Sequence, residues 1–487
     1  MFKKLIRKHF VIKGIIAMLD LTITQIHEGL KKKDFSSTEI TKTYLDSIKK
    51  TDKNIGAYLA ITEKLALAQA GRADEIIKNE KNFGPLTGVP CSIKDVILVE
   101  GEKCTAASKI LENYVAPYDA TVIKKLKKAG TVILGKVNMD EFAMGSSTEN
   151  SAFKVTKNPH DLTRVPGGTS GGSAASVAAN QAVFSLGTDT GGSIRQPASF
   201  CGVVGLRTTY GSVSRYGVVA DASSLDQVGP ITKTAEDAKI VFKVISGKDP
   251  MDATSAEYEF KETEITLKDL KIGVPKEYFT KGLDSEVKSI IENAIEKAEK
   301  AGAKIIPISL PTSQFALAAY YIIQTSEASA NLARYDGIRY GLSEKADTLL
   351  QTYIKSRGAG FGAEVKRRIM TGTYSLSIGY YDAYYKKAQQ VRELIKQDFA
   401  AAFKKVDVIF CPVSPFPAFK IGENTADPLS MYLADIYTVP INLAYLPALS
   451  LPAGKVGKLP VGLQIIGNHF EENKILGVGE AMEKMIQ

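Results

Sequence analysis

The chain has 487 residues, of which 44% are hydrophobic and 24% charged, a composition typical of water-soluble globular proteins. No apolar run is long enough to span a membrane. The four scattered cysteines form no CxxC pair, which argues against a zinc site or a disulfide framework and fits the cytoplasm. The formal net charge of +9 is spread over many lysines, so it fits either a lysine-rich proteome or an acidic partner such as nucleic acid.

Residues 1–17 form a basic and apolar leader, and a globular pattern begins at Met18. The leader is either a membrane-surface helix or targeting peptide, or the product of a wrongly placed translation start. Lys13 interrupts its apolar part and no convincing small-residue cleavage site follows, which favours the start-site explanation. We expect residues 18–487 to form a single domain.

Helices and strands alternate along the chain. A capping box at residues 36–39 predicts a helix that extends to about Lys50. A helix after Asp119 ends at Gly130 and leads into a strand over residues 131–137. A second such unit begins at Asp284 or Ser285, ends at Gly302 and continues as a strand over residues 304–310.

The C-terminal part shows three buried strands, at residues 406–412, 447–454 and 461–467, and a closing helix from about Glu472. This alternation predicts an α/β fold in which a large mixed or mostly parallel sheet is covered by helices on both faces. Residues 234–268 are unusually charged, which predicts an insertion there.

Two clusters of glycines and hydroxyl residues lie at residues 167–173 and 190–195. Glycine lets a backbone adopt positive φ and approach a ligand closely, so two such clusters with serines suggest a hydroxyl nucleophile. Residues 130–136 nearly match a phosphate-binding loop, but Val137 replaces the required Ser or Thr and the run predicts a strand. Residues 168–172 match the GxSxG elbow, which would make Ser170 the nucleophile with His469 as its histidine, although the fit is poor.

A serine nucleophile without a well-placed histidine needs another base, and lysine is the usual substitute. A lysine base must be neutral, so its pKa must fall by about 3 units, which requires burial. Lys94 lies in the apolar, strand-like run 88–99, where a solvated lysine is not expected. The alternative is a structural ion pair between Lys94 and Asp95 or another buried carboxylate.

Three segments, residues 92–97, 135–151 and 187–211, resemble the amidase signature family, and the resemblance covers nearly everything from Met18 onward. It implies an amidase-signature fold with Ser193 as the acyl-forming nucleophile and Lys94 as the terminal base. The hydroxyl that follows Gly167-Gly168 would carry the proton between them.

The bridging position departs from the family pattern, which usually has a serine held in a cis-peptide conformation. Here it is Thr169, whose hydroxyl donates and accepts as a serine does, and Ser170 remains the alternative bridge. The resemblance also implies an oxyanion hole formed by the backbone N–H groups of residues 190–193, namely Thr190, Gly191, Gly192 and Ser193. We expect Asp189 and Arg195 to stabilise this loop rather than to react.

Within the family, residues 320–341, 364–392 and 431–454 are most similar to the glutaminase (A) subunits of aspartyl/glutamyl-tRNA amidotransferases. This implies glutamine as the ammonia donor, with Arg368 binding its α-carboxylate and Asp435 its α-amino group. Ser170 and Tyr320 or Tyr321 would complete the substrate site. Alternatively, Arg367 and Arg368 belong to a solvated helix face. Tyr445 stands where the family usually has glycine.

The resemblance implies a function within a complex. Ammonia would serve transamidation of misacylated Glu-tRNA(Gln), Asp-tRNA(Asn) or both, with B and C subunits as partners and with tRNA reached through the complex. ATP and Mg are expected in a partner subunit, and no cofactor, metal or membrane is expected for this chain, which we expect to be cytoplasmic. The alternatives are a stand-alone amidase for other carboxamides and a non-catalytic scaffold, which an intact Lys94 and Ser193 disfavour.

Overall fold

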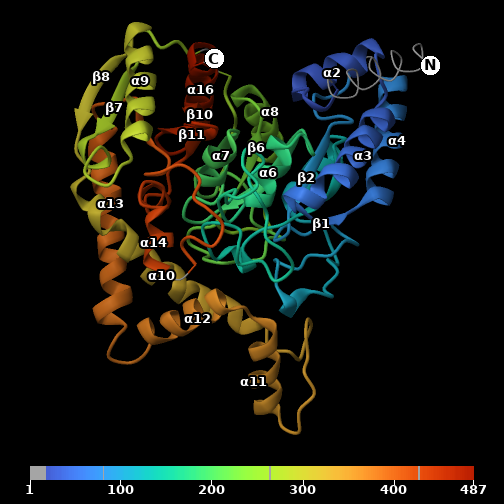
Figure 1. The fold of residues 1–487 in the computed structure, drawn as a ribbon, viewed down its shortest axis with the longest axis vertical. Helices are drawn as coiled ribbons and strands as arrows, with labels where there is room; N and C mark the ends of the chain where they lie inside the picture. The colour runs from blue at the N-terminus through green and yellow to red at the C-terminus, as the bar shows by residue number, and fades with distance from the viewer. Residues whose placement is uncertain (1–17, 81, 263–264, 426–427, 487) are drawn as a thin grey trace.

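The computed structural model describes residues 18–80, 82–262, 265–425 and 428–486, so the leader at residues 1–17 lies outside the described residues. An eleven-stranded sheet runs through the molecule in the order β1-β3-β2-β4-β6-β5-β10-β11-β9-β7-β8 (Figure 1). Its strands are β1 (Tyr58–Ile61), β2 (Pro90–Lys94), β3 (Val132–Val137), β4 (Phe184–Asp189), β5 (Val204–Arg207), β6 (Gln227–Thr232), β7 (Lys271–Pro275), β8 (Lys304–Ile308), β9 (Val408–Pro412), β10 (Ala448–Val456) and β11 (Leu459–Ile466).

The sheet is mixed, as the alternation of elements predicted. Strand β2 pairs in parallel with β3 and β4, and β7 pairs in parallel with β8 and β9. The other neighbours are antiparallel, including the long β10–β11 hairpin. Parallel strands place their carboxyl ends on one edge, so the parallel trio of β3, β2 and β4 defines the edge where β2 and β4 both end.

Helices cover both faces of the sheet, as predicted. In β10, Leu449 points to α8 (Ala235–Ile245) and α16 (Glu472–Ile486), because its side chain contacts Gly479 and Ala235. The next residue, Ser450, points to the opposite face, where Gly462 of β11 contacts Ser199 of α7 (Arg195–Cys201). Helix α9 (Ser285–Lys300) packs beside α16, and α6 (Gly171–Ala178) packs beside α7.

The predicted helix boundaries are confirmed at three places. Ser36 and Glu39 form the capping box of α3 (Ser37–Ile55), which extends five residues beyond Lys50 to end at Gly56. Asp284 is the N-cap of α9, and Gly302 follows that helix with φ +97°. Helix α5 (Thr121–Lys128) differs, because Asp119 does not cap it and instead accepts an ion pair from Lys127 at 2.7 Å.

The predicted insertion at residues 234–268 is wrong for its first half. Helix α8 buries Ala238, Val241, Phe242 and Ile245 completely in the main hydrophobic core, and it packs against β5 and β6. The charged residues that suggested an insertion therefore belong to the exposed side of a core helix. No helix within the described ranges is both long and apolar enough to cross a bilayer.

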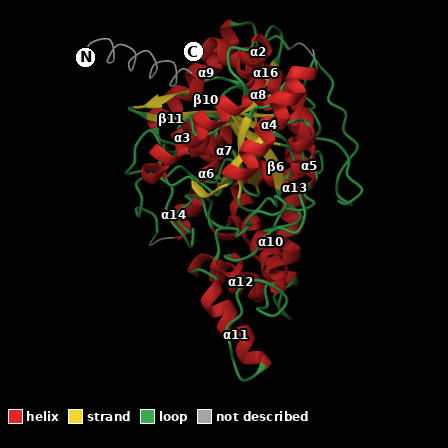
Figure 2. Ribbon diagram, turned by 90° about the vertical axis from the view of Figure 1, so that its right-hand side faces the viewer, coloured by secondary structure: helices red, strands yellow, loops and turns green. Residues whose placement is uncertain are grey.

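A helical arm projects from the body of the molecule (Figures 1 and 2). Its base contains α10 (Ala316–Asn331) and α13 (Lys387–Ala402), and α12 (Ala363–Ser375) and α11 (Leu349–Gly360) form its outer part. The remaining helices are α2 (Ile23–Lys32), α4 (Glu63–Asn79), α14 (Pro428–Leu433) and α15 (Val439–Leu443). Because α10 and α12 pack together, the arm contributes side chains to the interior near the end of the sheet.

Candidate active site

The predicted catalytic residues meet at the carboxyl ends of the parallel strands β2 and β4. Lys94 is the last residue of β2, and Ser193 lies in the turn between β4 and α7. Thr169 and Ser170 directly precede α6. The turns that follow such strands are where ligands bind in α/β sheets, so the topology brings together residues from three separate parts of the sequence.

The Lys94 amine is fully buried and surrounded by hydroxyl groups. Its Nζ lies 2.7 Å from Thr169 Oγ1, 2.8 Å from Ser170 Oγ and 2.8 Å from Thr188 Oγ1. Burial lowers the pKa of Lys94 to about 7, although the more distant carboxylates of Asp140 and Asp189 act in the opposite direction. A large share of the lysine is therefore neutral near pH 7, as a base requires.

The alternative of a structural Lys94–Asp95 pair does not hold. Successive residues at the end of β2 point to opposite sides, and the Asp95 carboxylate pairs with the buried amine of Lys136 at 3.1 Å. Thr105 donates from its backbone N–H to the same carboxylate at 2.9 Å. Asp95 thus neutralises Lys136, and no carboxylate bonds Lys94 directly among the described residues.

Thr169 and Ser170 both contact Lys94 but differ in their other bonds. The Ser170 hydroxyl donates to the Thr188 carbonyl at 3.0 Å and accepts from the Thr188 N–H at 3.3 Å. The Thr169 hydroxyl has no side-chain partner other than Lys94 among the described residues. The peptide bond before Thr169 is cis, the conformation that the family resemblance implies for the bridging residue.

The GxSxG interpretation of Ser170 finds no support in its surroundings. The candidate histidine, His469, hydrogen-bonds through Nε2 to the Ala444 carbonyl at 3.0 Å, and Ser170 has Lys94 and Thr188 as its side-chain partners. The Ser170 backbone N–H donates instead to the carbonyl of Ser193 at 3.1 Å, which fixes the two glycine-rich clusters against each other.

Asp189 holds the Ser193 loop from beneath, as expected for a residue that stabilises rather than reacts. Its carboxylate accepts Arg195 Nε at 3.0 Å and Arg207 Nη1 at 3.2 Å, and Asn442 Nδ2 donates to it at 2.7 Å. All four side chains are fully buried. The two guanidinium groups overcome the effect of burial and hold the pKa of Asp189 well below its ordinary value.

The predicted oxyanion hole needs one correction. The N–H of Gly192 donates to Asp189 Oδ1 at 3.0 Å, so it is committed to the carboxylate below the loop. The N–H groups of Thr190, Gly191 and Ser193 have no hydrogen-bond partner in the part of the chain that the structure describes. The sequence pattern alone does not distinguish these two orientations, because both need a glycine.

Tyr320 and Thr438 enclose the same loop from above. A Cβ atom added to Gly191 would lie 2.5 Å from Tyr320 Oη, so the phenol is packed against this glycine. Thr438 Oγ1 donates to the Gly191 carbonyl at 2.6 Å. Of the two tyrosines left open by the sequence, Tyr320 contacts the loop, and Tyr321 stacks on Tyr432 with ring centroids 3.8 Å apart.

Arg368 is not part of a solvated helix face, because it is 2% exposed while its neighbour Arg367 is on the surface. Glu364 accepts its Nε at 2.8 Å, and the rings of Tyr321 and Tyr432 lie 5.2 and 5.6 Å from its guanidinium carbon. Its buried Nη2 has no hydrogen-bond partner among the described residues. A buried guanidinium nitrogen without a partner is suited to receive a carboxylate.

Asp435 lies in the same region and is almost completely buried. Ser146 Oγ donates to it at 2.5 Å, and its carbonyl accepts the hydroxyl of Thr438, which reaches the Ser193 loop. Burial raises the pKa of Asp435 to about 7. A carboxylate of this kind gains from an ammonium group placed beside it.

A surface pocket of about 140 Å³ opens onto this region. Its lining includes Ser147, Glu364, Arg368 and Tyr432. The pocket therefore connects the arm helix α12 with the loop before α6, and it gives a small polar molecule access to the Arg368 guanidinium.

Several residues of this site are not among the sequence predictions: Thr188, Glu364, Tyr432, Thr438 and Asn442. Only Glu364 carries a local signal, because it stands four residues before Arg368 on one helix, the spacing of an ion pair. The others reach the site through tertiary packing, which a single sequence does not encode in a recognisable spacing.

Comparison with known proteins agrees with this geometry. The family model described as "Amidase" matches residues 39–476. The A subunit of the glutamyl-tRNA(Gln) amidotransferase of Caldanaerobacter subterraneus subsp. tengcongensis is 59% identical over 96% of each chain. The crystal structure of the same protein from Thermotoga maritima is 44% identical, with a TM-score of 0.80, and covers 96% of this chain and 95% of that one. The peptide amidase of Stenotrophomonas maltophilia is 26% identical, with a TM-score of 0.81, over 95% and 96% of the chains. The chain belongs to the amidase family.

Proposed function

We propose that this chain is the glutaminase (A) subunit of a tRNA-dependent amidotransferase and releases ammonia from glutamine through an acyl-Ser193 intermediate. The observation that carries the proposal is the pairing of two features at one place. A buried lysine base faces hydroxyl groups, and a cation and an anion, Arg368 and Asp435, lie beside the same loop. Two relatives, each named as the A subunit of a glutamyl-tRNA(Gln) amidotransferase, support the substrate.

The reaction begins with proton removal from Ser193. Neutral Lys94 accepts a proton from the Thr169 hydroxyl, and Thr169 takes the proton of Ser193 as its oxygen attacks the carboxamide carbon. Thr169 is the bridge rather than Ser170, because the Ser170 hydroxyl already donates to the Thr188 carbonyl. Ser170 and Thr188 instead orient the amine, which they contact at 2.8 Å each.

The negative charge of the tetrahedral intermediate falls on the former carboxamide oxygen. We assign its stabilisation to the N–H groups of Thr190, Gly191 and Ser193, which have no partner among the described residues. Gly192 contributes indirectly, since its bond to Asp189 fixes the loop before the substrate arrives. Such preorganised donors are worth roughly 3–4 kcal/mol of barrier each in related hydrolases.

Collapse of this intermediate expels ammonia. The relay runs in the opposite direction, so protonated Lys94 returns its proton through Thr169 to the leaving nitrogen. Water then attacks the glutamyl ester of Ser193, with the same lysine as base, and glutamate leaves. Each proton that Lys94 accepts is therefore returned within one half-reaction.

Free glutamine carries two charges that a simple amide lacks. The orphaned Nη2 of Arg368 would bind the α-carboxylate, and Asp435 would bind the α-amino group. Tyr320 would pack against the side chain of glutamine beside Gly191. The structure offers two buried charges to a substrate of this kind, which favours glutamine over the hydrophobic amides of the alternative function.

The partner subunits belong to the proposal as well. B and C subunits would carry ATP, Mg and the misacylated Glu-tRNA(Gln) or Asp-tRNA(Asn), in the cytoplasm, where the four free cysteines stay reduced. The arm supports a partner, because its helices expose Leu350, Ile354 and Met370 by more than half. The names of the relatives, as A subunits, support the same assembly.

Ammonia release from glutamine, measured for the chain alone and for the chain co-expressed with B and C subunits, tests the proposal. Ser193→Ala is expected to abolish release, whereas Ser173→Ala, a buried serine of α6 with a weak 3.4 Å bond, is expected to retain it. Unchanged release by Ser193→Ala would remove the nucleophile assignment. Strong hydrolysis of aliphatic or aryl amides by the chain alone, without glutaminase activity, would establish the stand-alone amidase instead.

A further inference from the structure

Two buried carboxyl groups, Asp221 and Asp226, lie together behind the Ser193 loop. The backbone N–H of Asp221 donates to Asp226 Oδ2 at 3.0 Å, and Thr190 Oγ1 donates to Asp226 Oδ1 at 2.7 Å. Asp221 is 1% exposed and Asp226 6%. Asp226 is thus one hydrogen bond away from a residue of the proposed oxyanion loop.

Neither carboxylate has a cationic partner among the described residues, although buried charges are normally paired. Arg207 directs its guanidinium to Asp189 and to the Leu225 carbonyl. Arg215 donates to Tyr210, Thr254 and the Ser223 carbonyl and pairs with Asp252. Within the described ranges, Asp221 and Asp226 form no ion pair with any lysine or arginine.

Two buried oxygen atoms at this place also lack a hydrogen-bond donor. Gln324 Nε2 donates to Asp221 Oδ1 at 2.6 Å, which leaves Asp221 Oδ2 and Gln324 Oε1 at the far ends of the paired groups. Both atoms are buried and have no partner in the described part of the chain. Gln324 is fully buried and stands one helical turn after Tyr320, so the two share the face of α10 that is turned to the Ser193 loop.

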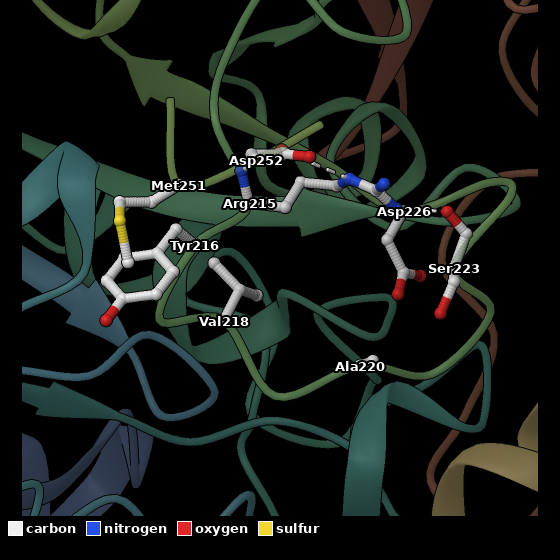
Figure 3. A pocket seen from close by; sticks show the side chains of 8 residues that line it. All are labelled: Arg215, Tyr216, Val218, Ala220, Ser223, Asp226, Met251 and Asp252. Atoms are coloured by element: carbon white, nitrogen blue, oxygen red, sulfur yellow. Dashed lines mark hydrogen bonds and ion pairs between the residues drawn. The ribbon is translucent and has the colours of Figure 1, made fainter. Parts of the chain in front are cut away.

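The pocket in Figure 3 connects this cluster with the surface. It has a volume of about 200 Å³, and Asp226 lines it together with Ala220 and Ser223. Figure 3 shows the Asp226 carboxylate turned away from the Arg215 guanidinium, which instead reaches toward Ser223 and Asp252. The pocket therefore reaches Asp226 from the opposite side to Thr190.

The missing partner must supply one positive charge and several hydrogen-bond donors in a small volume. Water brings donors but no charge, and no group of three or more His, Cys, Asp or Glu in the described residues is placed to hold a metal ion. An ammonium ion has both properties, with four N–H donors and a single charge. Ammonia is also the product that the Ser193 reaction would release on the other side of Thr190.

We propose that Asp221, Asp226 and Gln324 form a binding site for ammonium or ammonia released at Ser193, with the pocket of Figure 3 as its opening to the surface. The proposal deepens the proposed function and rests on it for the origin of the ligand. Binding itself is independent of glutamine hydrolysis. Ammonium chloride is therefore the probe for the full-length chain.

The first measurement is the melting temperature at pH 7 during titration with ammonium chloride, compared with sodium and potassium chloride at equal ionic strength. Ammonium is expected to raise the melting temperature of the wild type more than either salt. Asp221→Asn, which removes the charge at constant shape, is expected to weaken the apparent affinity by about tenfold or more. Gln324→Met, which removes the orphaned acceptor, is expected to do the same and carries the test if Asp221→Asn does not fold.

Asp237→Asn is the matched control. Asp237 is another fully buried aspartate whose Oδ2 lacks a partner among the described residues, but it lies on α8 and bonds Ile23. Its variant is expected to respond to ammonium like the wild type. A wild type stabilised equally by ammonium and sodium would show that a proton between Asp221 and Gln324 satisfies both atoms, and it would overturn the site. An equal response to potassium would overturn the assignment to ammonium.

The second measurement is inhibition of glutamine hydrolysis by added ammonium chloride. The inhibition constant is expected to rise about tenfold in Asp221→Asn and Gln324→Met and to stay unchanged in Asp237→Asn. Glutaminase activity without any ammonium effect would overturn this site and leave the proposed function standing. Ammonium binding by a chain that does not hydrolyse glutamine would leave the site standing and overturn the proposed function.

Discussion

Lys94 Nζ lies 2.7 Å from the hydroxyl of Thr169, and this hydroxyl has no other side-chain partner among the described residues. The pair explains why a threonine serves where the family usually has serine. The relay needs one hydroxyl that donates to the amine and accepts from Ser193, and the extra methyl group leaves both functions intact.

Thr169→Ser is therefore expected to retain or raise glutaminase activity, and Thr169→Val is expected to lower kcat about 10²- to 10⁴-fold, because valine keeps the shape but cannot relay a proton. Steady-state kinetics with glutamine give both values. Thr131→Val is the control, since Thr131 is equally buried and its hydroxyl lacks a partner within the described ranges. An active Thr169→Val enzyme would transfer the relay to Ser170.

The pH dependence of kcat/KM follows from two groups. Lys94 has a pKa lowered to about 7, and it acts as a base only when deprotonated. Asp435 has a pKa raised to about 7, and it attracts the substrate ammonium only when ionised. Lowering the pH through 7 therefore removes both active forms, and log kcat/KM is expected to fall with a slope that approaches two.

Asp435→Asn separates the two groups. The variant is expected to have a higher KM and a slope that approaches one, since Lys94 alone then titrates in this range. Rates of ammonia release across a pH series check both profiles. A wild-type profile that stays flat well below pH 7 would contradict the neutral-lysine mechanism.

Glu364 and Tyr432 position the guanidinium of Arg368. Glu364 accepts its Nε at 2.8 Å, and the Tyr432 hydroxyl donates to the same carboxylate at 3.0 Å. Glu364→Gln is expected to raise KM for glutamine by about tenfold with a smaller change in kcat, because it loosens a charge-assisted bond of about 1.5–3 kcal/mol.

Arg368→Lys is expected to raise KM further, since a lysine cannot bond Glu364 and the substrate in the same fork geometry. Arg367→Ala provides the control on the exposed side of the same helix turn, and its KM is expected to stay near the wild-type value. Equal effects of Arg367→Ala and Arg368→Lys would contradict a substrate role for Arg368.

Gly192 has φ +137°, and a Cβ atom there would overlap the hydroxyl of Thr438. Gly192→Ala is therefore expected to shift the loop, break the bond to Asp189 and lower kcat at least about 100-fold, because the oxyanion donors lose their arrangement. Gly71→Ala is the contrasting change, since nothing lies within 4 Å of its added Cβ in α4. It is expected to raise the free energy of unfolding by up to about 1 kcal/mol with unchanged activity.

Much of the fold can be predicted from local signals. The capping box at Ser36 and the Asp284 cap place two helices within a few residues, because the hydrogen bonds involved are formed by neighbours in sequence. Helix α10 gives no such signal. Its residues are apolar on several sides, since it packs against α12, α13 and α15, so no amphipathic period marks it.

The candidate site divides in the same way. Lys94 is predictable because a lysine in an apolar strand is unusual, and the structure places it in full burial. The orientation of the Gly192 N–H is not predictable, because it depends on Asp189, which two arginines and Asn442 hold from distant parts of the chain. Long-range bonds of this kind leave no spacing in the sequence.

Tyr445 shows how a departure from the family pattern acquires a physical reason. Its φ is +65°, the left-handed region in which glycine carries no penalty, and its ring packs against Tyr210 with centroids 4.9 Å apart. The Arg392 guanidinium carbon lies 4.2 Å from the ring centroid on the same residue. The tyrosine thus gains contacts that offset an unfavourable backbone conformation.

Two substitutions separate these contributions. Tyr445→Ala and Tyr445→Gly both remove the ring, but alanine keeps the Cβ atom that the left-handed conformation disfavours. The free energy of unfolding of the glycine variant is therefore expected to exceed that of the alanine variant by about 1 kcal/mol, the reverse of their order in a helix. Chemical denaturation of both variants measures the difference. An alanine variant as stable as the glycine variant would mean that the backbone relaxes out of the left-handed region once the ring is gone.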